Sequence, residues 1–173
     1  MESTLAYDFA LLLLRVGVGL TLAAHGWNKF FGGGRISGTG RWLNSIGIKP
    51  GRFNALLAAI SELGSGFLMA LGLLTPFAAA GVIGVMVVAG WTVHRSNGFF
   101  IIKEGWEYIY VLALVALVSA ILGPGSWSLD AQLGIAKRLD GFLGFWIALG
   151  FGLGGGLLQM ILFFRPSTVK SED

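Results

Sequence analysis

The chain has 173 residues, of which 55% are hydrophobic and only 12% are charged, and this composition excludes an ordinary soluble domain. The formal net charge of +3 is spread over several loops, so lipid head groups are expected partners and nucleic acid is not. No cysteine is present, which excludes disulfides, thiolate metal sites and iron–sulfur clusters built by this chain, and we expect no metal site.

The first apolar segment, Asp8 to Phe31, carries several polar side chains. About 20 apolar residues cross the hydrocarbon core of a bilayer, and each ionisable group deep within it costs roughly 2.5–3.5 kcal/mol. The segment nevertheless holds Arg15, His25, Asn28 and Lys29. At 100° per residue, Arg15, His25 and Lys29 share one arc of a helix, so we expect them to face partners inside a bundle.

A loop and a second span are expected next. Three consecutive glycines and Pro50 predict a loop over residues 32–52, in which Trp42 lies in the head-group layer. The second span is Phe53 to Leu74, with Glu62 near its middle. Small residues around Glu62 would let another helix approach closely.

The turn into the third span is short. Thr75 is expected to cap the third span, and Pro76 fits its first helical position. The span would continue to His94. Because the connection is so short, the second and third spans should be antiparallel neighbours.

The second half of the chain predicts two more spans and a surface helix. The fourth span is Trp106 to Leu122, which ends at Gly123-Pro124-Gly125. Residues 126–140 are amphipathic and too polar to cross, which predicts an interfacial helix. The fifth span, Phe142 to Phe164, completes an all-α membrane protein with a four-helix transmembrane bundle and a fifth, glycine-rich transmembrane helix.

Glycines in the fifth span form two GxxxG patterns. Gly150 and Gly154 make one pair, and Gly152 and Gly156 make the other. This spacing is typical of a helix that packs tightly against a neighbour.

The loop charges predict an orientation. Eight basic residues fall on one side of the five spans, namely Arg35, Arg41, Lys49, Arg52, Arg95, Lys103, Arg165 and Lys170. Only Lys137 and Arg138 fall on the other side. Because basic loops stay in the cytoplasm, we expect the amino terminus to lie outside the cell.

Polar residues of the first two spans can meet inside the bundle. Counted by helical rise, Glu62 lies at a depth between His25 and Arg15 and can reach either of them. One interpretation is structural, with a buried Arg15–Glu62 ion pair that fixes the helix register. The other is a polar cavity that binds a ligand, because intramembrane ionisable groups commonly line sites or pathways.

Seven polar residues are the candidate ligand-binding set, and no catalytic role is assigned to any of them. They are Arg15, His25, Asn28, Lys29, Glu62, His94 and Glu107. A bis-histidine haem between His25 and His94 is geometrically conceivable, but two histidines without a further motif favour ordinary boundary positions over haem ligation.

Three groups of short motifs, in order on successive spans, resemble the DoxX family of small bacterial membrane proteins. They are Arg15-Val16-Gly17 with His25-Gly26-Trp27-Asn28-Lys29, Glu62-Leu63-Gly64 with Gly72-Leu73-Leu74-Thr75-Pro76, and Gly105-Trp106-Glu107 with Gly123-Pro124-Gly125-Ser126-Trp127-Ser128-Leu129-Asp130. The resemblance implies a four-helix transmembrane bundle over residues 1–130. Residues 131–173 would add the interfacial helix, the fifth span and a polar tail.

The resemblance also implies a redox setting in the bacterial inner membrane. Relatives called DoxD belong to a thiosulfate:quinone oxidoreductase, and some DoxX proteins are associated with oxidative-stress or sulfur-redox assemblies. By that likeness the chain would be a subunit of a quinone-linked oxidoreductase, with the candidate set around a quinone head group or an anion. A partner subunit would supply the electrons.

Two other functions remain open from the sequence, and with them the question of whether the chain is an enzyme. One is a non-catalytic accessory or assembly subunit of a larger membrane complex. The other is a transporter of a small molecule or lipid that uses the same cavity. In each case the partners would be the lipid bilayer together with other membrane subunits or a second copy of the chain.

Overall fold

The computed structural model describes residues 2–166, and over this range the protein is built from helices. Beyond the helices it has a single antiparallel bridge between Ile48 and Phe164. The α-helices are α1 (Glu2–Phe31), α2 (Arg35–Ser45), α3 (Gly51–Leu71), α4 (Thr75–Ala89), α5 (Glu107–Leu122), α6 (Leu129–Gln132), α7 (Ala136–Leu139) and α8 (Gly141–Phe163). A π-helix, Gly90–His94, continues α4, and two 3₁₀ turns, Arg95–Asn97 and Ile101–Lys103, lie in the loop to α5.

Four helical segments are long and apolar enough to cross a bilayer. They are Thr4–Phe31, Gly51–Leu71, Thr75–Asn97 and Gly141–Phe163. The fifth apolar helix, α5, has only 16 residues, or about 24 Å at 1.5 Å per residue. The prediction of an all-α, multi-pass membrane protein is confirmed, with α5 shorter than the other spans.

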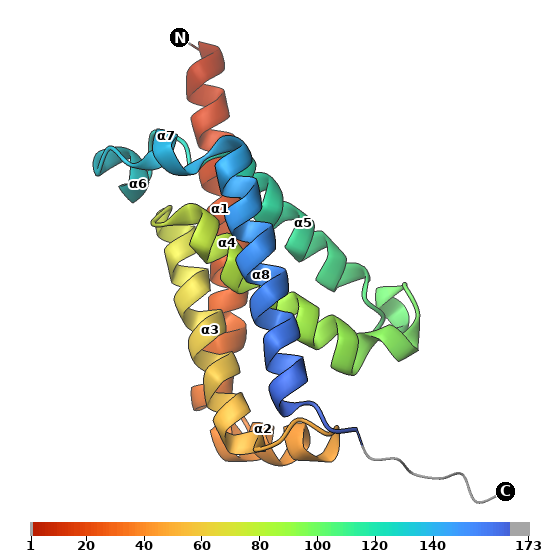
Figure 1. Cartoon of the computed structure of the whole chain (residues 1–173). Coiled ribbons are helices and arrows are strands. Elements are labelled where there is room, and N and C mark those ends of the chain that lie inside the picture. Colours follow the sequence, from red (N-terminus) through yellow and green to blue (C-terminus); the bar gives the residue numbers. More distant parts are fainter. Residues whose placement is uncertain (1, 167–173) are drawn as a thin grey trace, which may run out of the picture.

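The long helices run between two ends of the molecule (Figure 1). The start of α1 lies at one end together with α6 and α7, which we call the α7 end. The crossing helix α2 and the close of α8 lie at the other end, which we call the α2 end. Between them, α3 packs on α1, and α4 is packed between α3, α5 and α8.

Glycines bring α1 and α3 into backbone contact. A Cβ placed on Gly66 would lie 2.6 Å from Ala23 N and 2.6 Å from Gly19 O, and one placed on Gly26 would lie 2.6 Å from Leu63 N. Contacts this close are possible only between helices without side chains at these positions. They fix how far α1 is shifted along α3.

The two GxxxG patterns of α8 have different environments. A Cβ on Gly152 would lie 2.7 Å from Ile83 Cβ, and one on Gly156 would lie 2.9 Å from Val87 Cβ, so this pair packs against α4. A Cβ on Gly150 or Gly154 would have nothing within 4 Å in the described part of the chain. The packing prediction is therefore confirmed for one pair only.

Two predicted segments differ from the structure. Much of the loop expected over residues 32–52 is the helix α2, because Gly40 lets it lie directly on the start of α3, where a Cβ would approach Arg52 Cα to 2.9 Å. The single interfacial helix expected over residues 126–140 is instead two one-turn helices, α6 and α7. Gly134, with φ of 69°, reverses the chain between them, which a continuous helix cannot do.

The α1–α3 contact gives a first testable prediction, because Gly66 and Gly64 lie on opposite sides of α3. Alanine has a higher helix propensity than glycine by up to about 1 kcal/mol, so Gly64→Ala, which meets nothing within 4 Å, should leave the thermal midpoint unchanged or raise it. Gly66→Ala should lower the free energy of unfolding by about 1–3 kcal/mol, because the methyl group overlaps the α1 backbone. Tryptophan fluorescence during heating in detergent would measure both, and equal midpoints for the two variants would contradict the packing.

Candidate functional site

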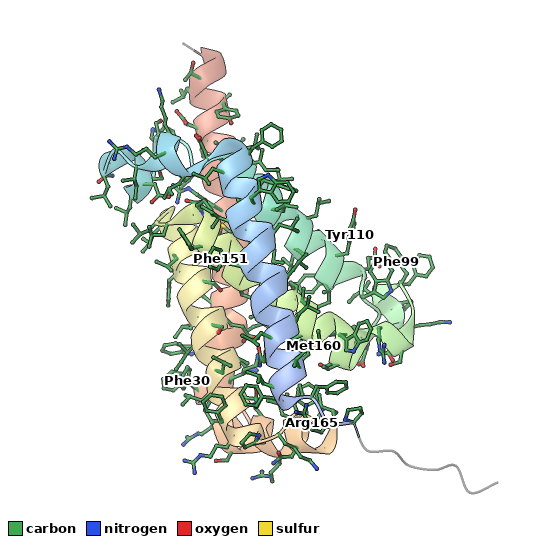
Figure 2. All side chains as sticks on the ribbon, viewed as in Figure 1. Phe30, Phe99, Tyr110, Phe151, Met160 and Arg165 are labelled. Atoms are coloured by element: carbon green, nitrogen blue, oxygen red, sulfur yellow. The ribbon has the colours of Figure 1, made fainter. Side chains whose placement is uncertain are left out.

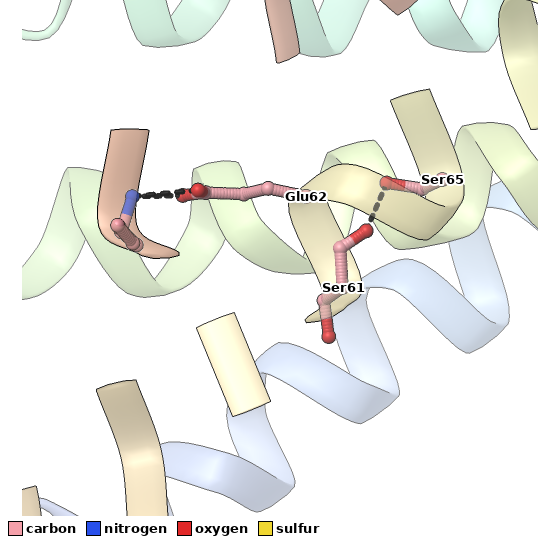
Figure 3. A network of polar contacts seen from close by, with 4 residues as sticks. Ser61, Glu62 and Ser65 are labelled. Atoms are coloured by element: carbon pink, nitrogen blue, oxygen red, sulfur yellow. Dashed lines mark hydrogen bonds and ion pairs between the residues drawn. The ribbon is translucent and has the colours of Figure 1, made fainter. Parts of the chain in front are cut away.

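The one salt bridge in the described range joins α1 to α3. Lys29 Nζ donates to Glu62 Oε2 at 2.6 Å and to Glu62 Oε1 at 2.8 Å. The Glu62 side chain is 8% exposed and that of Lys29 is 21% exposed. Figure 3 shows the Glu62 side chain reaching from α3 to a side chain on α1. Opposite charges from the first two spans therefore meet inside the bundle.

The pairing predicted between Arg15 and Glu62 is wrong, although both residues are buried. Gly26 lies level with Glu62, so Arg15 is eleven residues, or about 16 Å, further along α1. The prediction had Glu62 at a depth between His25 and Arg15, but α3 begins beside α2, at Gly51, which places Glu62 level with Gly26. Lys29 reaches Glu62 because helical side chains lean towards the amino terminus of their helix.

Arg15 instead joins three segments at the α7 end. Its Nε donates to Pro124 O at 3.1 Å, and its two other guanidinium nitrogens donate to the carbonyls of Ala70 and Trp127. The side chain is only 3% exposed. The guanidinium thus donates to carbonyl groups at the C-terminal end of α3 and in the turn that leads to α6. This is a structural role.

Asp130 completes this end of the bundle. Its carboxylate accepts hydrogen bonds from Leu74 N at 2.7 Å, from Thr75 N at 2.9 Å and from Thr75 Oγ1 at 2.7 Å. The cap that the sequence assigned to Thr75 is therefore provided by a carboxylate 55 residues further along the chain. This negative charge also suits the positive end of the α4 dipole.

A cavity of about 350 Å³ lies beside the Lys29–Glu62 pair, towards the α2 end. We call it the polar cavity. Of the candidate set, His25, Lys29, Glu62 and His94 line it. Its other walls include apolar residues of α4 and α5, such as Met86 and Leu112. Ligand sites in proteins commonly have this character, with a few convergent polar groups in a mainly apolar surface.

His94 is placed at the cavity by an irregularity in α4. Gly90–His94, near the end of the span, form a π-helix, and π-turns within α-helices are frequent at functional sites. His94 Nδ1 lies 2.6 Å from the carbonyl oxygen of Glu104 in the following loop. This contact leaves Nε2 as the ring nitrogen available to a ligand.

Three of the predicted site residues lie elsewhere. Arg15 is held at the α7 end, as described above. Asn28 is exposed on α1 and does not line the cavity. Glu107 Oε2 accepts a hydrogen bond from Ile101 N at 2.9 Å and so belongs to the loop between α4 and α5.

Six further polar or aromatic residues line the cavity without having been predicted there. They are Thr39, Trp42, Ser61, Thr92, Tyr108 and Gln159. Gln159 is a lone amide in the apolar α8, a signal that could have identified it, and its Nε2 donates to Asn54 Oδ1 on α3 at 3.1 Å. Trp42 and Tyr108 reach the cavity through packing that the sequence pattern does not specify.

The fold and the polar cavity define a polytopic α-helical membrane protein with a ligand-sized site inside its helical bundle. The family model for DoxX matches residues 10–95, and the chain belongs to the DoxX family. The matched region covers α1 to α4 and includes the Lys29–Glu62 pair and His94.

Two relatives extend this comparison. The chain is 31% identical over 136 residues to an uncharacterized membrane protein of Mycobacterium tuberculosis, an alignment that covers 72% of this chain and 81% of that protein. It is 33% identical over 86 residues to an uncharacterized protein of Haemophilus influenzae, covering 49% of this chain and 56% of that protein. No solved structure matches the chain significantly.

A double-mutant cycle at Lys29 and Glu62 would measure their interaction. Glu62→Gln should lower the free energy of unfolding by about 2 kcal/mol, since it leaves a charged partner without its counter-ion. Lys29→Met should do the same. The double variant should be more stable than the sum of the two losses predicts, with a coupling of about 1–3 kcal/mol. Additive losses would show that the pair does not interact.

Proposed function

We propose that the protein is a membrane component of a quinone-linked redox assembly and that the quinone head group binds in the polar cavity. The observation that carries the proposal is the Lys29–Glu62 pair, which forms the charged wall of an otherwise mainly apolar cavity of about 350 Å³. The redox setting rests on the resemblance to DoxX and DoxD proteins. Both the cavity and the family fit a small, flat, amphipathic ligand.

The residues of the cavity suit the chemistry of a quinone head group. Its two carbonyl oxygens are hydrogen-bond acceptors, and Lys29 is a donor at the cavity. His94 donates through Nδ1 to the Glu104 carbonyl, so its Nε2 would accept a hydrogen bond from a hydroxyl of the reduced head group. When bound, a quinone accepts two electrons and two protons. Glu62 and His25 would hold and deliver protons at the cavity wall, in the manner of general acids.

The electrons must come from another component, because the chain has no cysteine thiols to donate them. A partner protein is therefore part of the proposal. The cavity lies towards the α2 end, where α2 and the end of α8 would meet such a partner. The chain would position the quinone and exchange its protons.

One observation favours a second candidate function, that of a non-catalytic accessory subunit. Gly150 and Gly154 form a GxxxG pair on α8 that meets no other residue of the described chain. Such a pair is suited to close contact with a transmembrane helix of another protein. In this case α8 would serve assembly and the cavity would be structural.

Binding of a quinone is directly measurable, since Trp42 lines the cavity. Titration of the detergent-purified protein with decylubiquinone or dimethylnaphthoquinone should quench tryptophan fluorescence saturably. The quenching should be lost in Trp42→Phe. Lys29→Met and Glu62→Gln should each weaken binding about tenfold, the effect of losing one hydrogen bond to a charged group.

Lys137→Gln provides the control, because Lys137 lies on α7 at the opposite end. It should bind the quinones as the unmodified protein does. Saturable quenching that is unaffected by Lys29→Met and Glu62→Gln, or no saturable quenching at all, would reject the proposed site.

The same proposal includes an orientation in the bacterial inner membrane, with the α2 end in the cytoplasm and the amino terminus outside. Its support is the gathering of basic residues on the loops of the α2 side, whereas Lys137 and Arg138 lie at the α7 end.

Because the natural chain has no cysteine, single cysteines can report this orientation cleanly. A membrane-impermeant maleimide should label Gln132→Cys, on α6, in intact cells. It should label Ser37→Cys, on α2, only after the membrane is opened; both side chains are exposed in the structure. The reverse pattern would invert the topology.

A further inference from the structure

A second concavity lies on the opposite side of α4 and α5 from the polar cavity. It has a volume of about 540 Å³, within the usual range for ligand sites, and it is walled by α4, α5 and α8. Representative residues of the three walls are Val87, Ala113 and Leu153. We call it the apolar groove. It shares only Met86 and Ile109 with the polar cavity, so these two side chains separate the two spaces.

One end of the apolar groove is cationic and aromatic. Arg95 lines it there, with its guanidinium carbon 4.1 Å from the centroid of the Trp91 ring. Trp106 and Tyr110 line the same end. Within residues 2–166, Arg95 takes part in no salt bridge. The carboxylate of Glu107 is nearby in sequence but is bonded to Ile101 N. A guanidinium stacked on an indole and free of carboxylates is suited to an anionic group from outside the chain.

The loop beside this end has the properties of a segment that contacts lipid. Phe100 and Ile102 are 65% and 89% exposed, and Phe99 projects from the side of the molecule (Figure 2). Exposed apolar side chains of this size are unfavourable in water and favourable in a membrane.

The backbone of this loop is satisfied internally. Trp106 N donates to Gly98 O at 3.1 Å, Glu107 N to Phe99 O at 2.8 Å, and Gly105 N to Phe100 O at 3.1 Å. Irregular backbone can lie at the membrane only when its polar groups are bonded in this way. Because α5 is about 24 Å long and the hydrocarbon core is about 30 Å thick, the loop reaches into the lipid layer.

We propose that the apolar groove binds one anionic phospholipid, with its phosphate at Arg95 and an acyl chain between α4, α5 and α8. Arginine favours phosphate because its planar group donates two parallel hydrogen bonds. Trp91 and Trp106 mark the depth of the head groups, where indole rings are enriched. The groove wraps a chain on three sides, whereas an ordinary boundary lipid meets one convex face. The inference is independent of the quinone proposal, since it concerns a different space.

Native mass spectrometry of the whole protein, released from nanodiscs of mixed phosphatidylglycerol and phosphatidylcholine with identical chains, would test this. One phosphatidylglycerol should stay bound in preference to phosphatidylcholine. Arg95→Gln should reduce this retention at least fivefold. Arg41→Gln, which removes an exposed charge on α2 away from the groove, should leave it unchanged.

Substitutions that fill the groove with a larger side chain should also prevent lipid binding, without removing the charge of Arg95. Ala113→Trp should abolish retention of both lipids. Leu114→Trp, at a position that is already 43% exposed, should narrow the groove and reduce retention with less strain on the core. Thermal midpoints close to that of the unmodified protein would show that a variant is folded. Equal retention of the two lipids, or no effect of Arg95→Gln, would overturn the proposal. Displacement of the bound lipid by a long-chain quinone would also overturn it, because the groove would then hold a quinone tail.

Discussion

Cationic side chains inside hydrocarbon must find partners within the protein, and α1 carries two of them. Arg15 and Lys29 are separated by 14 positions, which places them on one face of the helix but near opposite ends of the bundle. Each is satisfied in a different way. Arg15 bonds three backbone carbonyls, and Lys29 bonds one carboxylate. Together these contacts join α1 to both ends of the buried part of α3 and to the turn after α5.

At the α7 end the buried polar groups bond to other parts of the protein. Arg15 satisfies carbonyls at the close of α3 and in the turn after α5, and Asp130 satisfies the first amides of α4. Every bond here joins segments that are distant in the chain. Because each of these groups is buried and bonded to distant segments of the chain, we regard this end as the structural anchor of the fold.

At the α2 end several polar side chains face a cavity and can contact a ligand. Lys29 and Glu62 face a cavity together with His25 and His94, and the cavity is large enough for a small cyclic molecule. Two features form this cavity. The helix α2 covers its end with Thr39 and Trp42, and the π-helix after α4 brings His94 to its wall. The apolar groove on the other side of Met86 and Ile109 adds a surface of opposite character, open to lipid and cationic at one end. Under the two proposals, a quinone head group would occupy the polar cavity and an anionic phospholipid the apolar groove.

The sequence by itself determined the membrane class, the helical spans and the burial of Arg15 and Glu62, because apolar length and the cost of charge in hydrocarbon are local properties. It placed Arg15 and Glu62 too close in depth, since the two residues lie near opposite ends of the bundle. Only the tertiary structure decided that Glu62 pairs with Lys29 and Arg15 with backbone carbonyls. That choice depends on how far α1 is shifted along α3, which is determined by the close backbone contacts at Gly19, Gly26 and Gly66. The helix α2, the cap from Asp130 and the cavity positions of Trp42, Tyr108 and Gln159 have the same origin, since each depends on contacts between segments that no local pattern specifies.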